Sequence, residues 1–220
     1  MILMLPILDD VTKSWFGLAT WLLIVSTCVV SIVALNSADE QQLYLVRNFT
    51  ISLKDDLSFF EHIKRMFAAL FIHADYFHLG FNMLFLFAFG LSLEKRLGII
   101  RFLVLYFGSG ALGWLFYEEA TGAQRYALGA SGAISGVIAA YLILFPSAKF
   151  LSAVVILWFV KFFYIRAWVY ILLWIAVQIL AARYDTSSNV AYSAHMGGIV
   201  FGLLFGLWSK VRGVSVRGSV

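Results

Sequence analysis

Long runs of hydrophobic residues follow one another along this chain, and charged residues are concentrated in the stretches between them. Six runs come near the roughly 17 to 25 residues that a helix needs to cross a bilayer: residues 16–35, 77–93, 99–117, 127–145, 167–182 and 190–208. The pattern predicts an all-α, polytopic membrane protein built as a bundle of six transmembrane helices.

Composition supports this interpretation, because 62% of the 220 residues are hydrophobic and only 13% are charged. A soluble domain of this size does not have such a balance. There are no tandem repeats or Pro/Gly-rich linkers, so we expect a single domain over residues 1–220. A further apolar stretch, residues 150–160, is too short to span a bilayer, and we expect it to be interfacial or re-entrant.

The distribution of Lys and Arg predicts an orientation, because basic residues near span ends are retained on the cytoplasmic side. Six spans place both termini on one side, and ten of the 16 basic residues fall there. We therefore expect both termini in the cytoplasm. The basic pI of about 9.2 follows from this arrangement and gives no argument for nucleic-acid binding.

The connection between the first two spans, residues 36–76, is much longer than most connections in compact domains. Hydrophobic residues at positions 59, 63, 66, 67 and 70 have the spacing of an amphipathic helix. We expect a partly helical first loop at the membrane interface.

Four polar residues fall at nearly one depth in the predicted bundle. Spans two, four and six all run inward from the outer face, and near their starts they carry His78, Asn82, Ser131 and His195. At 1.5 Å per residue, most of these lie about 6 to 8 Å below the outer boundary. Ionisable and polar groups inside a membrane usually serve a function.

Glycines next to these residues predict close helix packing. Span four carries Gly132 and Gly136, and span six carries Gly198 and Gly202, a spacing that lets two backbones approach closely. Gly129 precedes the serine. Close approach of the two spans would bring Ser131 within reach of His195.

A serine hydroxyl becomes a good nucleophile when a histidine accepts its proton, so the pair is the minimum apparatus for acyl transfer. His78, Asn82 and the backbone N–H of Ser131 are candidate donors to the developing oxyanion. No carboxylate lies at this depth, which predicts a Ser–His dyad rather than a triad. Each residue alone has a structural alternative, such as packing or helix–helix hydrogen bonding, but their shared depth favours chemistry.

The remaining histidines do not predict a metal site or any other cofactor. On a continuous helix, the rings of His73 and His78 would point about 140° apart, unlike the i, i+4 pair of a zinc site. His62 is expected to be an ordinary loop residue.

Several motifs together resemble the rhomboid family of intramembrane serine proteases, over nearly the whole chain. They are Gly129-x-Ser131-Gly132, Ala194-His195-x-x-Gly198, His78-x-x-x-Asn82, Phe71-x-His73 and Leu93-Glu94-Lys95-Arg96-Leu97-Gly98. The resemblance implies a six-helix core that cleaves transmembrane segments of membrane proteins near their outer end. It assigns Ser131 as nucleophile and His195 as general base and then acid. The oxyanion hole would consist of His78, Asn82 and the Ser131 amide.

The sequence departs from the family pattern at two places. A Trp-Arg pair of the first loop is replaced by Lys64-Arg65, and a tyrosine that stacks on the histidine in some members is replaced by Ser135. Orientation of the His195 ring must therefore come from another residue. The absence of extra soluble domains is typical of a minimal bacterial type, so we expect a bacterial inner membrane, with organelle forms as the alternative.

Hydrolysis inside a bilayer requires water, which predicts a polar cavity with residues 183–189 as a lid. We expect its lining to comprise His78, Asn82, Ser131, Ser135, Ser193 and His195. The family resemblance implies lateral entry of substrate between spans two and five, past the candidate gate residues Phe81, Phe85, Trp168 and Trp174. The alternatives are a catalytically inactive rhomboid-like protein that binds membrane clients and, with less support, a small transporter.

Overall fold

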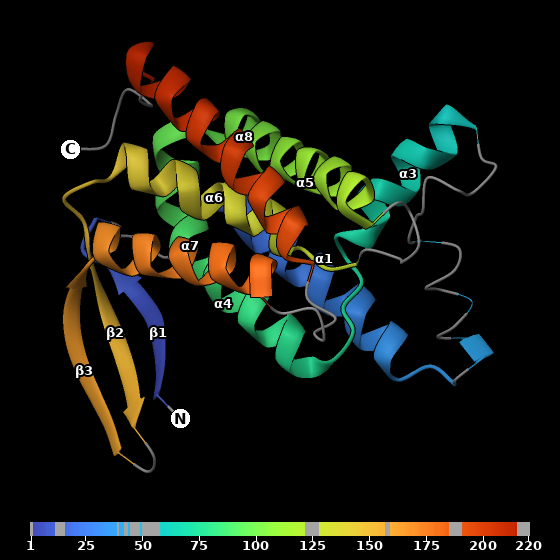
Figure 1. Cartoon of the computed structure of the whole chain (residues 1–220), viewed down its shortest axis with the longest axis horizontal. Helices are drawn as coiled ribbons and strands as arrows, with labels where there is room; N and C mark the ends of the chain where they lie inside the picture. The colour runs from blue at the N-terminus through green and yellow to red at the C-terminus, as the bar shows by residue number, and fades with distance from the viewer. Residues whose placement is uncertain are drawn as a thin grey trace.

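The structure, a computed structural model, describes residues 2–11, 16–38, 40–41, 44, 49, 58–121, 128–156, 159–184 and 191–214. Its main feature is a bundle of six long helices (Figure 1). They are α1 (Leu18–Leu35), α4 (Tyr76–Leu97), α5 (Ile99–Thr121), α6 (Ser131–Leu144), α7 (Ala167–Tyr184) and α8 (Tyr192–Val211).

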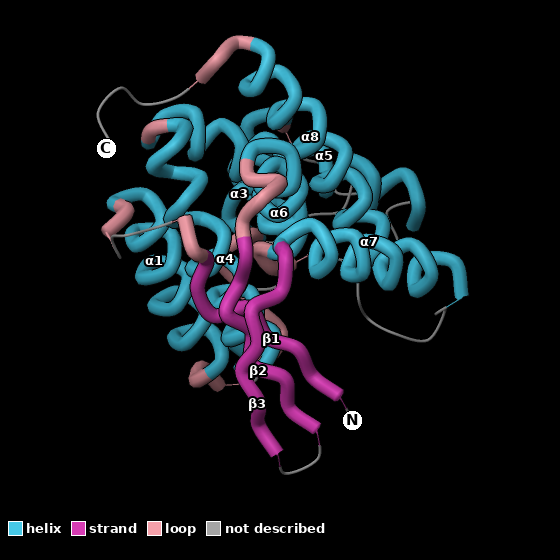
Figure 2. The backbone as a smooth tube through the Cα atoms, turned by 90° about the vertical axis from the view of Figure 1, so that its left-hand side faces the viewer, coloured by secondary structure: helices cyan, strands magenta, loops and turns pink. Residues whose placement is uncertain are grey.

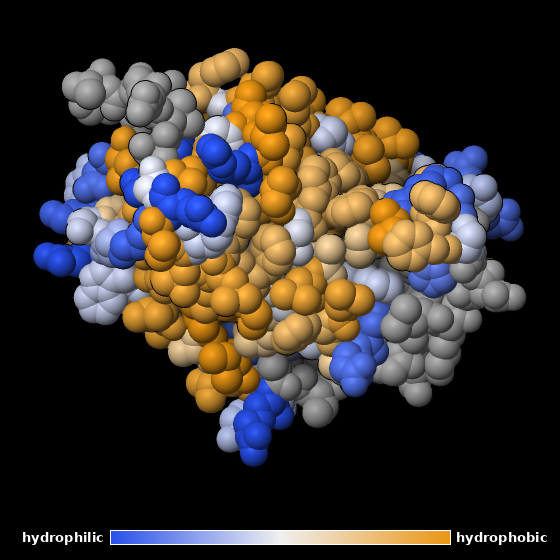
Figure 3. Space-filling model, turned by 90° about the horizontal axis from the view of Figure 1, so that it is seen from above, coloured by the Kyte–Doolittle hydropathy of each residue, from blue (hydrophilic) through white to orange (hydrophobic). Residues whose placement is uncertain are grey.

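Each predicted span corresponds to one of these helices, so the predicted helical bundle is confirmed. Among the described residues, α1, α4, α5 and α8 are long and apolar enough to cross a membrane. The apolar helical segments of α6 (Ser131–Leu144) and α7 (Ala167–Leu180) are shorter. Large hydrophobic side chains remain exposed on the outside of the bundle, including Val29, Ile100, Leu173 and Leu204. Figure 3 shows hydrophobic residues over the middle of one face and hydrophilic residues mostly toward its two ends. Such a surface suits lipid better than water.

Helix α6 is the centre of the bundle, and it packs most extensively against α8. Glycines make this possible: a methyl group on Gly198 would overlap the carbonyl oxygen of Gly132, and one on Gly202 would overlap that of Gly136. A methyl group on Gly113 of α5 would lie 2.7 Å from the carbonyl oxygen of Ala194. The three helices are therefore in backbone contact, as small-residue stripes in membrane helices predict.

A carboxylate inside the bundle fixes the start of α1. Glu94, near the end of α4, is 5% exposed. Its two oxygens accept hydrogen bonds from the backbone N–H groups of Ala19 and Thr20, at 2.9 and 2.7 Å, and from the Thr20 hydroxyl at 2.7 Å. Because the first N–H groups of a helix have no partner within it, a negative charge at this end is stabilising. Gly98 then ends α4 with φ of 78°. The motif at residues 93–98 thus has a structural role.

A three-stranded antiparallel sheet projects from one end of the bundle (Figure 2). Its strands are β1 (Ile2–Asp9), β2 (Lys149–Ile156) and β3 (Phe159–Arg166), in the order β1-β2-β3. Within the apolar stretch at 150–160, residues 150–156 and 159–160 form β-strands, which we did not predict, and the all-α expectation holds for the bundle alone. Residues of high β propensity are frequent in β2 and β3, and a short apolar run is ambiguous between helix and strand.

Polar and aromatic contacts fasten the sheet to the bundle. Asp9 of β1 accepts hydrogen bonds from the hydroxyls of Ser92 and, at 2.6 Å, Tyr141. The ring of Phe150 is fully buried, with its centroid 4.6 Å from that of Phe89 and 5.4 Å from that of Tyr141. The sheet is thus tied to α4 and α6 at the end of the bundle where these helices finish.

The first loop contains α3 (Phe59–Ala69), which confirms the predicted amphipathic helix. Ser58 caps it by accepting a hydrogen bond from the Glu61 N–H at 3.3 Å. Met66 and Ala69 are buried, while Phe59 and Phe60 are 73% and 82% exposed. His62 lies in this helix, within the first loop.

Replacement of Gly198 by alanine tests the role of the α6–α8 contact. The added methyl group would overlap backbone, which cannot move as a flexible side chain does, so we expect a loss of at least about 2 kcal/mol in stability. Thermal unfolding of the purified protein in detergent measures this. The matched control is Gly80→Ala, because a methyl group there meets nothing within 4 Å; equal melting temperatures of the two variants would contradict the packing account.

Candidate active site

Ser131 is the first residue of α6 and follows a turn formed by Gly129 and Ala130. The Gly129 N–H donates to the Ala69 carbonyl oxygen at 2.9 Å, which joins this turn to the end of α3. Ser131 itself is half-buried. Its position gives its backbone N–H the field of a helix N-terminus, where negative charge is favoured.

His195 is the fourth residue of α8 and is 7% exposed. The preceding residue, Ala194, directs its carbonyl oxygen at Gly132, where a methyl group would lie 3.4 Å away. The residue after Ser131 therefore contacts the residue before His195. The two helix starts adjoin, which is the arrangement that a Ser–His pair requires, and the hydrogen bond between Ser131 and His195 stays a prediction.

The ring of His195 is held by a residue that the sequence analysis did not identify. Its Nδ1 lies 2.7 Å from Oε1 of Gln178, a buried residue of α7. The rings of Trp174 and Tyr192 lie 6.3 and 6.0 Å from the imidazole, centroid to centroid. A signal was present in the sequence, since Gln178 is the sole amide side chain between residues 167 and 182, and polar residues in membrane helices are commonly functional.

The predicted oxyanion donors lie near the start of α4. Asp75 caps this helix by accepting a hydrogen bond from the His78 N–H at 2.7 Å. The Asn82 side chain donates to the His78 carbonyl oxygen at 2.9 Å, which uses one of its two amide hydrogens. The His78 ring lies against Gly129, where a methyl group would be 2.7 Å from Cε1. Gly129 also has φ of 103°, so both its conformation and its neighbour require glycine.

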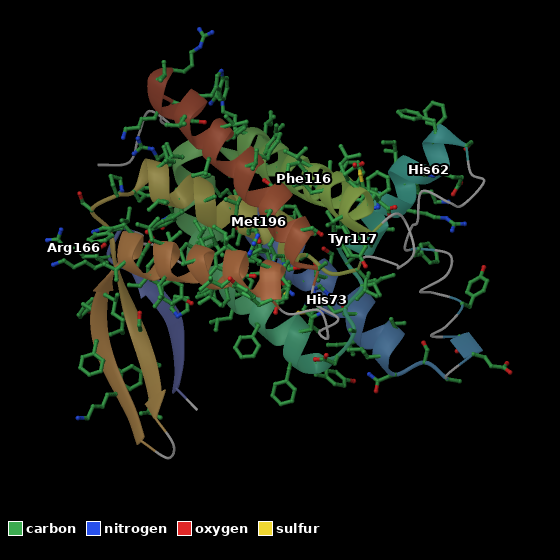
Figure 4. All side chains as sticks on the ribbon, viewed as in Figure 1. His62, His73, Phe116, Tyr117, Arg166 and Met196 are labelled. Atoms are coloured by element: carbon green, nitrogen blue, oxygen red, sulfur yellow. The ribbon has the colours of Figure 1, made fainter. Side chains whose placement is uncertain are left out.

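His73 has a different place from the one we expected. Because α4 begins only at Tyr76, His73 lies in the turn before it, and its ring packs 4.9 Å from that of His78 instead of pointing away. The prediction that the two rings diverge is wrong. Figure 4 shows His73 within the molecule, close to the start of the bundle helices, whereas His62 lies out on α3.

The hydrogen bonds of His73 define its tautomer. The Ser31 hydroxyl donates to the Phe71 carbonyl oxygen at 2.8 Å, so it accepts from Nδ1 of His73 at 3.0 Å. The Ala130 N–H donates to Nε2 at 3.3 Å. A neutral His73 with its proton on Nδ1 satisfies all three bonds, and it links α1 to the turn that precedes Ser131.

A small pocket of about 30 Å³ lies beside Ser131, large enough to admit a water molecule. It is lined by α3, α5 and the starts of α6 and α8, and includes Leu70, Trp114, Ser131 and Ala194. Of the six residues expected to line a polar cavity, this pocket includes Ser131. Of the predicted lid, Arg183 and Tyr184 end α7, while 185–189 lie outside the described residues.

The fold and these residues define a multi-pass integral membrane protein with a serine and a histidine on adjoining helix starts. The sequence profile described as the rhomboid domain matches residues 61–210. The chain belongs to the rhomboid family.

Relatives of this chain include two proteins named as mitochondrial and one from a bacterium. It is 39% identical over 141 residues to "Rhomboid protein 1, mitochondrial" of Saccharomyces cerevisiae, which covers 62% of this chain and 39% of that protein. It is 29% identical over 215 residues to "Presenilin-associated rhomboid-like protein A, mitochondrial" of Danio rerio, covering 93% and 51%. It is 38% identical over 78 residues to "Putative rhomboid protease YdcA" of Bacillus subtilis, and this match covers 36% of this chain and 39% of that protein.

The chain thus spans between about two fifths and half of the length of these relatives. The rhomboid family is confirmed, and the bacterial type stays a prediction.

His73 predicts a pH dependence of stability. Burial, with a smaller effect of nearby His78, lowers the pKa of His73 from 6.5 to about 3, although Asp75 opposes the shift. Between pH 6.5 and about 3, His73 therefore binds a proton in the unfolded chain but not in the folded protein. Stability should be complete above pH 6.5 and fall by about 1.4 kcal/mol per pH unit as the pH drops from 6.5 toward 3.

Melting temperatures of the wild type and His73→Gln between pH 7.5 and 4.5 measure this dependence. The neutral glutamine should flatten the decline, although it lowers stability at pH 7.5. Parallel curves for the two proteins would show that His73 does not carry the proton linkage.

Proposed function

We propose that this protein is an intramembrane serine endopeptidase that cleaves transmembrane segments of other membrane proteins near their outer end. The observation that carries the proposal is the contact between the start of α6 and the start of α8, which puts Ser131 and His195 on adjoining helix turns. Both residues required for acyl transfer are present, which argues against the alternative of an inactive rhomboid-like protein that binds membrane clients.

In this mechanism Nε2 of His195 accepts the proton of the Ser131 hydroxyl while Oγ attacks the scissile carbonyl carbon. The oxyanion of the tetrahedral intermediate accepts hydrogen bonds from His78, Asn82 and the Ser131 N–H. When the intermediate collapses, His195 returns the proton to the leaving amine, which leaves an acyl-enzyme. Water, deprotonated by His195, attacks the acyl-enzyme, and collapse of the second intermediate releases the carboxylate and restores Ser131.

The names of relatives agree with this activity at the level of the family. One relative is named a putative rhomboid protease and another, from Emericella nidulans, "Rhomboid-type serine protease 2". Others are named only rhomboid-like. The protease reading for this chain rests on its own site residues together with these names.

Substrate is proposed to enter sideways between α4 and α7. The two helices meet through Tyr170, whose ring lies 6.2 Å from that of Phe85 and 6.4 Å from that of Phe89. These contacts lie on the early part of α7, away from the Gln178 end. Because a helical substrate hides its scissile carbonyl, we expect substrates with helix-weakening Gly, Pro or polar residues near the outer boundary. Small side chains are expected at the cleaved residue.

The orientation is part of the proposal. Both termini face the cytoplasm, and the site opens toward the opposite side of the membrane. The basic residues at the sheet end of the bundle, among them Lys95, Arg96, Lys149 and Arg166, support this orientation. The compartment expected from the sequence is a bacterial inner membrane, and the mitochondrial relatives make an organelle membrane the alternative.

Cleavage in proteoliposomes tests the activity. The wild type should cut a model transmembrane segment that carries small residues and a glycine near one boundary, and Ser131→Ala and His195→Ala should each lose at least about a thousandfold in rate. Fragments are measured by mass spectrometry, and Ser26→Ala, at an exposed serine of α1 away from the site, serves as control. A folded wild type that cuts none of a panel of such segments would favour the client-binding alternative.

Smaller side chains in the gate should speed turnover. Phe81 and Trp168 are 39% and 42% exposed, Phe85 packs on Tyr170, and Trp174 lies beside His195. Replacing each by valine opens the path between α4 and α7, so we expect a severalfold higher initial rate of cleavage for at least one variant. Unchanged rates in all four variants would exclude this entry route.

A further inference from the structure

Helix α7 carries a single amide in an otherwise apolar inward stripe. Ala167, Ile171 and Gln178 are buried and Trp174 is half-buried, at the spacing of one helix face. Neighbouring residues on the other faces are exposed, among them Leu172, Leu173, Val177 and Ile179. Burying an amide costs free energy unless it is hydrogen-bonded, and leucine would fill this stripe without that cost. Gln178 therefore calls for an explanation.

The partner of this amide is the proposed catalytic base. Oε1 of Gln178 lies 2.7 Å from Nδ1 of His195, and both residues are buried. A carbonyl oxygen only accepts, so Nδ1 carries the proton and Nε2 keeps its lone pair. Nε2 is the nitrogen that must accept the serine proton. The hydrogen bond thus selects the tautomer that the proposed reaction needs.

Gln178 is the side chain that the structure shows in hydrogen-bond contact with Nδ1 of His195. Ser135, which replaces the stacking tyrosine of some family members, donates instead to the Ser131 carbonyl oxygen at 2.7 Å. The rings of Trp174 and Tyr192 lie beside the imidazole. Ring orientation, which the sequence analysis assigned to an unidentified residue, is supplied by Gln178.

We propose that Gln178 is a positioning residue for His195, which makes the catalytic base depend on the position of α7. The inference rests on the proposed protease function. Two functions follow from the one contact: the amide selects the reactive tautomer, and it connects the active site to the helix that borders the proposed substrate entrance.

Helix α7 is packed firmly at its start and sparsely over the part that carries Gln178. Its first residues are anchored in two ways. Strand β3 continues directly into Ala167, and the side chains of Tyr170 and Ile171 are buried. Its packing on α6 and α8 is sparse beside the packing of those two helices on each other. Beyond Ile171, over the described side chains up to Leu180, Gln178 is the one buried residue of α7. A displacement of this part of α7 by an entering substrate helix would move the acceptor of the His195 proton.

Three variants test the proposal, with the rate of reaction of Ser131 with a fluorophosphonate probe as a readout that requires no substrate. Gln178→Leu keeps the size of the side chain but removes the acceptor, and we expect the rate to fall by about tenfold to a hundredfold. Gln178→Glu restores an acceptor and should recover much of that loss. Val177→Ala, one residue away and 51% exposed, is the control and should react as the wild type does.

The pH profile separates positioning from a structural role. A carboxylate at position 178 stabilises the imidazolium of His195, so the acidic limb of the rate profile of Gln178→Glu should move to higher pH. A merely structural role would leave that limb in place. For cleavage of a model segment, Gln178→Leu should lower kcat with little change in KM.

The outcomes distinguish the two proposals. A wild type that never reacts with the probe overturns the protease function itself. A reactive wild type, with Gln178→Leu equally fast and Gln178→Glu unshifted, overturns the role of Gln178 alone. If Gln178→Leu does not fold, the pH profile of Gln178→Glu decides, and an unshifted acidic limb overturns the inference.

Discussion

The backbone contact between α6 and α8 is the constraint on which the rest of the structure depends. Gly132 and Gly136 meet Gly198 and Gly202 with no room for a methyl group between them. In a bilayer, apolar side chains gain little by leaving lipid to contact one another, so close packing must hold membrane helices together. The same contact sets the starts of the two helices side by side. Packing and the geometry of the site therefore have one origin.

Ionisable groups divide between the two ends of the bundle. At the sheet end, Glu94 and Asp9 accept hydrogen bonds that hold α1 and β1 in place. At the other end, His73, His78 and His195 form contacts around the turn before Ser131 and the start of α8. At the site end, the carboxylate of Asp75 caps α4, and the amide of Gln178 contacts the His195 ring. The His195 imidazole has an amide as its hydrogen-bond partner, which is the role we assign to Gln178.

Much of this arrangement could be predicted from the sequence, because its signals are local. Hydrophobic runs gave the six helices, the spacing of residues 59–70 gave α3, and glycine pairs indicated which helices touch. What could not be predicted depends on distant partners. The sheet joins β1 to residues about 150 positions later, and a short apolar run does not reveal whether it pairs. The His73 ring was misplaced because one continuous helix from His73 to His78 was assumed, whereas α4 begins only at Tyr76. Gln178 was missed because its partner lies on another helix.

The most direct test of the central claim is to locate the residue that a fluorophosphonate probe modifies in the folded protein. Mapping the adduct by mass spectrometry after digestion identifies it, and comparison with heat-unfolded protein removes unspecific reaction. If α6 and α8 bring an activated serine to His195, the adduct lies on Ser131 and its formation requires the imidazole. An adduct on Ser135 or Ser193, or none on folded protein, would contradict the account.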